Sequence, residues 1–145
     1  MNEQDISSHS DTDFDNVLQT PQVTHYLLHD DDTYPDNAEA GSKLPLLVYQ
    51  GALALPEEDP ASVIEALLEA HQWGGTWRNG IYSFHHYHST AHEVLGVYRG
   101  TAKVQLGGEE GVVLSIKPGD VVIIPAGVAH KNLGASANFR VVGAY

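Results

Sequence analysis

The amino-acid sequence predicts a mainly β protein, a single antiparallel β-barrel or jelly roll with one short amphipathic helix and extra N-terminal strands. The chain has 145 residues, the length of one ordinary domain. From Arg78 onward apolar residues recur with a period of two, and the short runs alternate with turns that contain glycine or proline. Between Pro60 and Trp73 the apolar period is that of a helix. A β domain with a single helix follows from these three observations.

The N-terminal segment is acidic. Residues 1–42 hold ten of the nineteen acidic residues and no lysine or arginine, so most of the net charge of −12 lies there. The first residues also carry few apolar side chains, a composition that cannot offset the entropy of ordering the chain. We therefore expect a disordered acidic tail over residues 1–20 and one folded domain over residues 21–145.

Two strands and the helix come first in the domain. Apolar runs over residues 23–28 and 45–50 predict strands separated by a polar loop. Asp59 is a capping residue and Pro60 suits the first position of a helix. Apolar residues recur at helical spacing up to Trp73, where a pair of glycines ends the pattern. We expect the apolar stripe of this helix to pack on the outside of a sheet.

The rest of the chain predicts a series of short strands. They span residues 80–88, 93–99, 101–106, 111–117, 120–124, 128–132 and 138–144. Residues 120–124 are apolar at both parities, which predicts a strand that is covered on both faces. The N-terminal strands, the helix or a second subunit would provide this cover.

Three histidines and a glutamate have the pattern of a metal site. His86 and His88 are two residues apart, so on a strand their side chains point to the same face. On a helix the same spacing would turn them away from each other, and the pair therefore favours a strand. Glu93 follows after a stretch long enough for a tight turn, and His130 lies on a later strand. Together they make a plausible set of ligands for one ion.

These residues also match two long signatures of one protein family. Residues 80–100 resemble the first signature of the cupin family at every fixed position, and these positions include both histidines and the glutamate. Residues 119–130 resemble the second signature, which ends at His130. The sequence then departs from the family, because Gly134 stands where an asparagine is usual and Asn132 stands two residues after the histidine instead. The whole segment is most similar to small, single-domain bacterial cupins with no assigned reaction.

The resemblance implies a cupin barrel that binds one divalent transition metal per chain through His86, His88, Glu93 and His130. Imidazole ligands suit Zn, Cu, Fe and Ni, and a carboxylate extends the choice to Mn, so the identity of the metal stays open. The resemblance also implies a small-molecule ligand or substrate. Cupin barrels commonly pair, so we expect a homodimer.

Neighbouring residues leave alternatives open at this site. His92 competes with Glu93, because a turn tighter by one residue would give a site with four histidines. His85 is out of register with the pair, so we expect it at a surface or an interface. Other side chains share the inward parity of the ligands and are expected to face a pocket or the core: Tyr82, Phe84, Leu95 and Val97.

Three functions fit the sequence. The first is a metal-dependent small-molecule enzyme of the dioxygenase or isomerase type, with no catalytic residue assigned beyond the ligands. The second is a non-catalytic module that holds a metal or a small ligand in the same site. The third is a metal-free, epimerase-like barrel with histidine as base and tyrosine as acid. The intact ligand set argues against the third, because proton transfer does not need four converging ligands.

Composition excludes several other classes of function. From residue 43 onward nine acidic residues face seven basic ones, so the basic footprint of a nucleic-acid-binding protein is missing. The sequence has neither a stretch of membrane-spanning length nor a basic start followed by an apolar run. It has no cysteine, and so neither a disulfide nor a thiolate zinc site. We expect a cytoplasmic protein without nucleic-acid or membrane partners.

Overall fold

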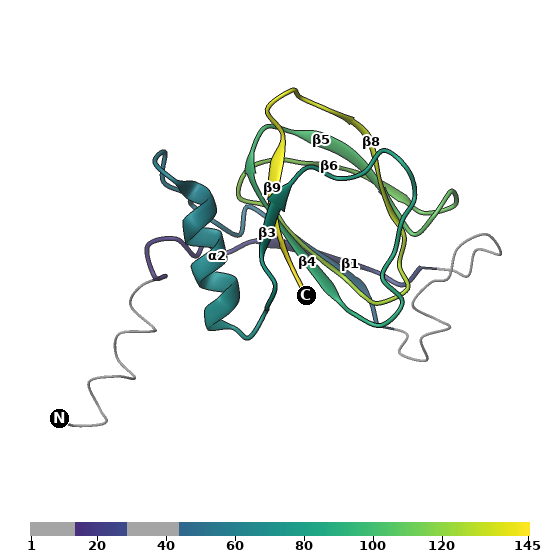
Figure 1. The fold of residues 1–145 in the computed structure, drawn as a ribbon, viewed down its shortest axis with the longest axis horizontal. Helices are drawn as coiled ribbons and strands as arrows, with labels where there is room; N and C mark the ends of the chain where they lie inside the picture. Colours follow the sequence, from purple (N-terminus) through teal and green to yellow (C-terminus); the bar gives the residue numbers. More distant parts are fainter. Residues whose placement is uncertain (1–13, 29–43) are drawn as a thin grey trace.

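Two antiparallel sheets face each other in the computed structural model, which describes residues 14–28 and 44–145. Helix α2 (Pro60–Ala70) lies outside the sheets, as Figure 1 shows. The predicted fold class is confirmed, namely a mainly β jelly roll with a short helix and additional N-terminal strands. In the part of the chain that the structure describes, the two sheets stay separate and do not join into a closed barrel.

The larger sheet has six strands and the smaller one has three. Across the larger sheet the order is β1 (Gln22–Tyr26), β2 (Leu46–Gln50), β7 (Val121–Ile124), β4 (Glu93–Arg99), β9 (Arg140–Ala144) and β3 (Trp77–Asn79). Across the smaller sheet the order is β6 (Val112–Ile116), β5 (Ala102–Leu106) and β8 (His130–Ala135). These bounds lie within three residues of the predicted strands, with one exception.

The exception is the predicted strand over residues 80–88, which is wrong as a continuous strand. The chain first forms β3, which pairs with β9 at one edge of the larger sheet. The Asn79 side chain then accepts a hydrogen bond from the Gly80 N–H at 2.8 Å, where β3 ends. Beyond it the chain crosses to the smaller sheet, where His86 forms an isolated antiparallel bridge with His130. The run is broken because its two ends pair with different sheets.

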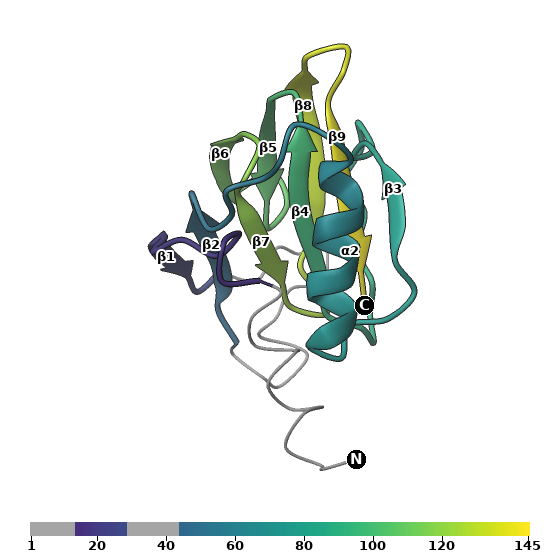
Figure 2. The same cartoon turned by 90° about the vertical axis from the view of Figure 1, so that its left-hand side faces the viewer.

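The main hydrophobic core lies between the two sheets, and a second cluster lies between the larger sheet and α2. Strand β7 contributes to both. Val122 and Ile124 belong to the core between the sheets, whereas Val121 and Ile123 pack against the cluster under the helix. Apolar side chains therefore pack on both faces of this strand, as predicted, and those of Val121 and Ile123 are half-buried. Figure 2 shows α2 in front of β4 and β9, beside β7.

Helix α2 begins where the sequence predicts and ends earlier. Asp59 is the N-cap residue and Pro60 follows it. Ile64 packs closely on the sheet, because a Cβ added at Gly96 of β4 would lie 2.9 Å from the Ile64 Cγ2 atom. The last helical residue is Ala70, and Gln72 adopts the left-handed conformation with a φ of 70°. The helix thus ends before the two glycines that were expected to end it.

Of the predicted tail over residues 1–20, the structure describes only residues 14–20. Residues 1–13 lie outside the described residues, as does the predicted loop over residues 29–43. Within the described part, Leu18 forms an isolated bridge with Leu53, and Val17 packs against the cluster under the helix. The last residues of the predicted tail therefore belong to the domain. No described helix has the length and apolar character of a membrane span.

Asp120 is buried at the turn before β7 and holds two segments together. Its side chain is 1% exposed, and its oxygens accept backbone hydrogen bonds from Gly51 at 2.9 Å and from Lys117 at 3.0 Å. Asp120→Ala is expected to lower the free energy of unfolding by about 1–3 kcal/mol, because two partly buried backbone N–H groups lose a charged acceptor. Asp120→Asn, with one oxygen left, should lose less. Urea unfolding measures both, and an unchanged midpoint in the alanine variant would contradict this role.

Candidate metal centre

The His86–His88 segment runs beside β8 although it is not a regular strand. Two backbone hydrogen bonds join His86 and His130, at 3.2 and 2.9 Å, and the Gly127 N–H donates to the His88 carbonyl at 2.8 Å. These bonds keep the segment extended and antiparallel to its neighbour. The ring centroids of His86 and His88 are consequently 6.1 Å apart. His86 and His88 are therefore close together, as predicted, although the strand predicted over residues 80–88 does not form.

The structure brings the four predicted ligands together. Ring nitrogens of His86, His88 and His130 all lie within 4.8 Å of one another. Glu93, the first residue of β4, comes from the opposite sheet. Its Oε2 atom lies 3.2 Å from Nε2 of His88 and 3.2 Å from Nε2 of His130. The cluster therefore bridges the two sheets, and both sheets fix its geometry.

Several polar atoms of this cluster are buried without a hydrogen-bond partner. They are Nδ1 of His86, Oε2 of Glu93 and Nε2 of His130. A buried carboxylate that lacks a compensating partner is costly, and so is a buried ring nitrogen. A divalent cation would compensate these atoms together, since imidazole nitrogen and carboxylate oxygen are both good ligands for transition metals. The residues present therefore fit a metal ion.

Hydrogen bonding orients the His130 ring for such a role. His130 is 2% exposed, and its Nδ1 lies 3.3 Å from the Val128 carbonyl oxygen. A carbonyl only accepts, so this contact assigns the proton to Nδ1 and leaves the lone pair on Nε2. Nε2 is the atom that lies next to Glu93. This arrangement of a ligand histidine held by a backbone carbonyl is common in metal sites.

Burial keeps the His86 ring neutral. It lowers the pKa of His86 from 6.5 to about 4, with a further contribution from neighbouring His130. Between pH 6.5 and 4 the unfolded chain binds a proton at this residue that the folded protein does not bind. The stability from this group is therefore complete above pH 6.5 and is lost as the pH falls towards 4.

The metal-free protein should accordingly unfold more easily at pH 4.5 than at pH 7, and His86→Asn should reduce this difference. Thermal unfolding of both metal-free proteins at the two pH values measures the effect. The comparison isolates His86, because the other titrating groups are shared. Parallel pH dependences in the two proteins would show that His86 does not titrate in this way.

His92 and Asn132, the two uncertain neighbours, make other contacts. His92 Nδ1 accepts a hydrogen bond from the Ala126 N–H at 2.9 Å, so that this side chain supports the loop before β8. The Asn132 side chain contacts the Ile81 carbonyl oxygen at 3.4 Å and accepts from the Gly134 N–H at 2.8 Å. Asn132 therefore shapes a bulge in β8. His85, expected at a surface, is partly buried.

A cavity of about 320 Å³ opens beside the cluster. Its wall includes Trp77, Ile81, Tyr82, Leu95 and Tyr145. Tyr82 and Leu95 were expected to face inward, although Tyr82 is 59% exposed at the rim. Phe84, expected to face inward as well, is 57% exposed and stacks on Tyr82 with ring centroids 4.9 Å apart. Val97 is buried in the core between the sheets.

Sequence reasoning missed two wall residues, Trp77 and Tyr145. Neither belongs to a motif. Trp77 reaches the cavity through the pairing of β3 with β9, and Tyr145 through its two backbone hydrogen bonds with Gly74. Arg78 borders the same cavity, but its guanidinium binds Glu65 of α2, with Nε and Oε2 3.0 Å apart. This contact raises the pKa of Arg78. The charge of Arg78 is therefore neutralised at the helix.

Comparison with known proteins finds a matching family model and a similar bacterial protein. A family model described as Cupin domain matches residues 77–141. The uncharacterized protein YjlB of Bacillus subtilis (strain 168) is 41% identical over 120 residues, which are 83% of this chain and 67% of that protein. Residues 77–141, which the family model matches, contain all four clustered side chains.

Two solved structures are also similar. A DUF861 family protein of Thermotoga maritima has 24% identity and a TM-score of 0.38, over 62% of this chain and 94% of the other. The ribosomal oxygenase YcfD of Escherichia coli has 13% identity and a TM-score of 0.47, over 99% of this chain and 43% of the other.

Proposed function

This chain belongs to the cupin family, and from that premise we propose that it is a metal-dependent enzyme acting on a small molecule, of the dioxygenase or isomerase type. In this proposal His86, His88, Glu93 and His130 bind one divalent transition metal per chain, which is Fe, Mn, Ni, Zn or Cu. One observation carries the proposal: a carboxylate oxygen and two imidazole nitrogens are buried in the cluster without hydrogen-bond partners.

The surrounding residues have separate tasks. A metal bound here would polarise an oxygen of the substrate or lower the pKa of bound water. His130 presents Nε2 because its other ring nitrogen faces the Val128 carbonyl. Ile81 and Leu95 give the cavity an apolar wall that excludes water from part of the site. A metal held by these four side chains would be accessible to a substrate from the cavity.

A metal-free, epimerase-like site fits the geometry less well. Such a site needs one base and one acid at the substrate, whereas here Glu93 is 2% exposed and lies against two imidazoles. A carboxylate beside one imidazole also suits a histidine base, but proton transfer does not need the convergence of three imidazole rings and a carboxylate. A metal ion would compensate the buried Oε2 atom of Glu93 together with the buried ring nitrogens of His86 and His130.

Turnover assays separate the enzyme from the alternative, a non-catalytic module. Metal-loaded protein is incubated with diketones, sugar phosphates and aromatic diols, and both binding and product are followed. The proposal expects product from at least one class, and loss of that product in His88→Ala. Saturable binding without product across the panel would instead indicate a non-catalytic module that holds a metal or a small ligand.

We also propose a homodimer and a cytoplasmic location. Strand β1 is an edge strand of the larger sheet, and its exposed Val23, together with Leu27 just beyond it, supports an interface there. Val23 is 51% exposed and Leu27 is 62% exposed. Light scattering after size-exclusion chromatography should give twice the mass of one chain, and a monomer at micromolar concentration would contradict the homodimer.

A further inference from the structure

The cavity beside the candidate metal centre has an unused hydrogen-bond donor in its wall. Nε1 of Trp77 is buried, and its contact with the Tyr145 hydroxyl does not reach hydrogen-bond geometry. Leaving such an N–H unsatisfied costs about 1–3 kcal/mol, so an orphan donor in a cavity wall calls for an explanation. Trp77 lines the same cavity as the clustered histidines. An acceptor atom of a ligand in this cavity would satisfy it.

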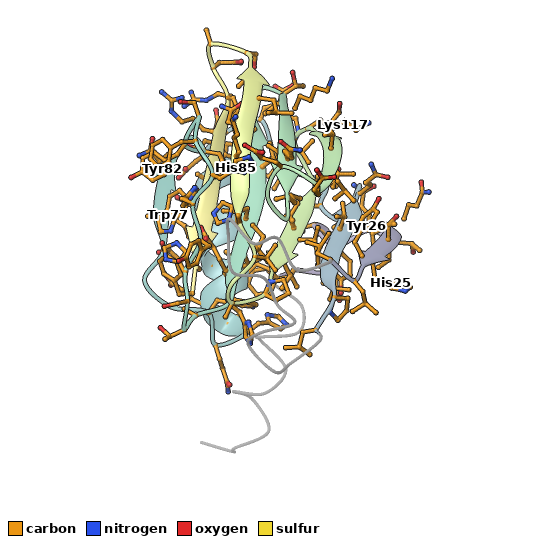
Figure 3. The ribbon with its side chains drawn as sticks, turned by 90° about the vertical axis from the view of Figure 1, so that its right-hand side faces the viewer. His25, Tyr26, Trp77, Tyr82, His85 and Lys117 are labelled. Carbon is orange, nitrogen blue, oxygen red and sulfur yellow. The ribbon has the colours of Figure 1, made fainter. Side chains whose placement is uncertain are left out.

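The indole ring is held in place by its neighbours. Trp77 pairs with Gly143 of β9, and a Cβ added at Gly143 would overlap the six-membered ring of the indole. Glycine therefore allows the ring to lie flat against β9. On the next residue, the Arg78 side chain is tied to Glu65 of α2. Trp77 and Tyr82 lie on the same flank of the molecule, far from β1 (Figure 3).

Tyr145 provides a second donor beside the first. Its backbone exchanges two hydrogen bonds with Gly74, both at 2.9 Å. Its ring centroid lies 4.9 Å from that of His88, next to the cluster. The Tyr145 hydroxyl contacts the Trp77 indole. Both residues line the cavity, so the phenol lies close to the indole N–H.

The wall around these donors is uncharged and aromatic. The guanidinium of Arg78 is bound to Glu65, so it does not offer a free positive charge to the cavity. Trp77, Tyr82 and Tyr145 present ring surfaces, and flat ligands pack well against such surfaces. These properties select an uncharged acceptor on a flat and mostly apolar body.

We propose that Trp77 Nε1 and the Tyr145 hydroxyl form a subsite for a neutral carbonyl oxygen, and that the cavity takes compact, flat, largely apolar carbonyl compounds. The inference rests on the proposed function, because it names the ligand class of the same cavity. The metal would hold the other end of such a ligand. The two residues are positioning and specificity-determining groups for the proposed substrate.

The test uses two probes with the same apolar body, acetophenone and ethylbenzene, of which the first has a carbonyl group and the second does not. Indole N–H resonances of the zinc-loaded protein are followed by NMR during each titration. The chain has two tryptophans, so Trp73→Phe identifies the resonance of Trp77. Acetophenone should shift this resonance downfield and bind about 5- to 10-fold more tightly than ethylbenzene, the ratio that one net hydrogen bond gives.

Two conservative variants complete the test. Trp77→Phe and Tyr145→Phe remove one donor each and keep an aromatic ring, so each should reduce the preference for acetophenone and leave ethylbenzene binding within about twofold. Trp73→Phe, which alters a tryptophan outside the cavity, should keep the preference. If neither variant changes the preference, if Trp77→Phe weakens both probes equally, or if neither probe binds, the subsite is refuted.

Failure of the proposed function would look different. The probe pair does not depend on chelation, so the same titrations can be repeated with metal-free protein. A protein that never binds metal but prefers acetophenone would contradict the metal-dependent function and keep the carbonyl subsite. A protein that binds metal but shows no preference for acetophenone would contradict the carbonyl subsite and keep the metal-dependent function.

Discussion

His88→Ala is expected to weaken binding of a divalent transition metal by at least about 100-fold, because even outer-shell partners of metal ligands contribute 10- to 100-fold. The fold should persist. The His88 side chain is 38% exposed, whereas that of His130 is 3% exposed, so removing the His88 ring leaves little buried empty space. Titration with zinc in the presence of a competing chelator measures the affinity, and far-UV circular dichroism checks the fold.

His92→Ala is the matched control for this variant. It removes a nearby imidazole whose Nδ1 accepts a hydrogen bond from the Ala126 backbone and does not join the cluster. Its metal affinity should stay within a few-fold of that of the unchanged protein. If His92→Ala lost the metal and His88→Ala kept it, the site would be the four-histidine alternative or a different one.

Glu93→Gln is expected to change metal binding and stability in opposite directions. The amide has lost the negative charge and binds a transition metal poorly, so affinity should fall by at least about 100-fold. The metal-free variant should be more stable than the metal-free parent by about 1–3 kcal/mol. The reason is that Oε2 of Glu93 is buried without a hydrogen-bond partner, whereas an amide N–H could donate to an imidazole 3.2 Å away.

Urea unfolding of metal-free protein, together with the same zinc titration, tests this prediction. Glu110→Gln is a suitable control, because Glu110 is exposed and distant in sequence from the cluster. Glu110→Gln should change neither the zinc affinity nor the free energy of unfolding. A Glu93→Gln protein that is less stable than its parent without metal would mean that the carboxylate is kept for folding and not for an ion.

The proximity of His86 and His88 could be predicted because it depends on local spacing, whereas Glu93 and His130 are assigned to the site through the family signatures. His86 and His88 face one side in any extended segment, whether or not the segment belongs to a regular strand. The strand itself was wrong because a single sequence does not reveal that β3 pairs with β9 while His86 bridges to His130. Period-two patterning marks extended chain, and pairing partners decide whether it becomes a strand.

The cavity wall depended on information that the sequence does not carry. Trp77 reaches the cavity through its register opposite Gly143, and Tyr145 through its backbone bonds to Gly74. Both are long-range pairings between segments without a motif. The end of α2 was missed for a local reason, since Gln72 adopts the left-handed conformation that glycine usually takes. Apolar parity, in contrast, correctly predicted the burial of Leu95.

Elemental analysis of the untagged protein, purified near neutral pH without chelator, tests the proposed metal centre most directly. We expect about one equivalent of a divalent transition metal per chain, and its loss in His88→Ala. Iron would favour oxygen-dependent oxidation, whereas nickel, manganese or zinc would leave isomerase or hydrolytic chemistry open. A protein that contains no metal and takes up none on reconstitution would contradict the metal-dependent function, and the buried Glu93 would then need another explanation.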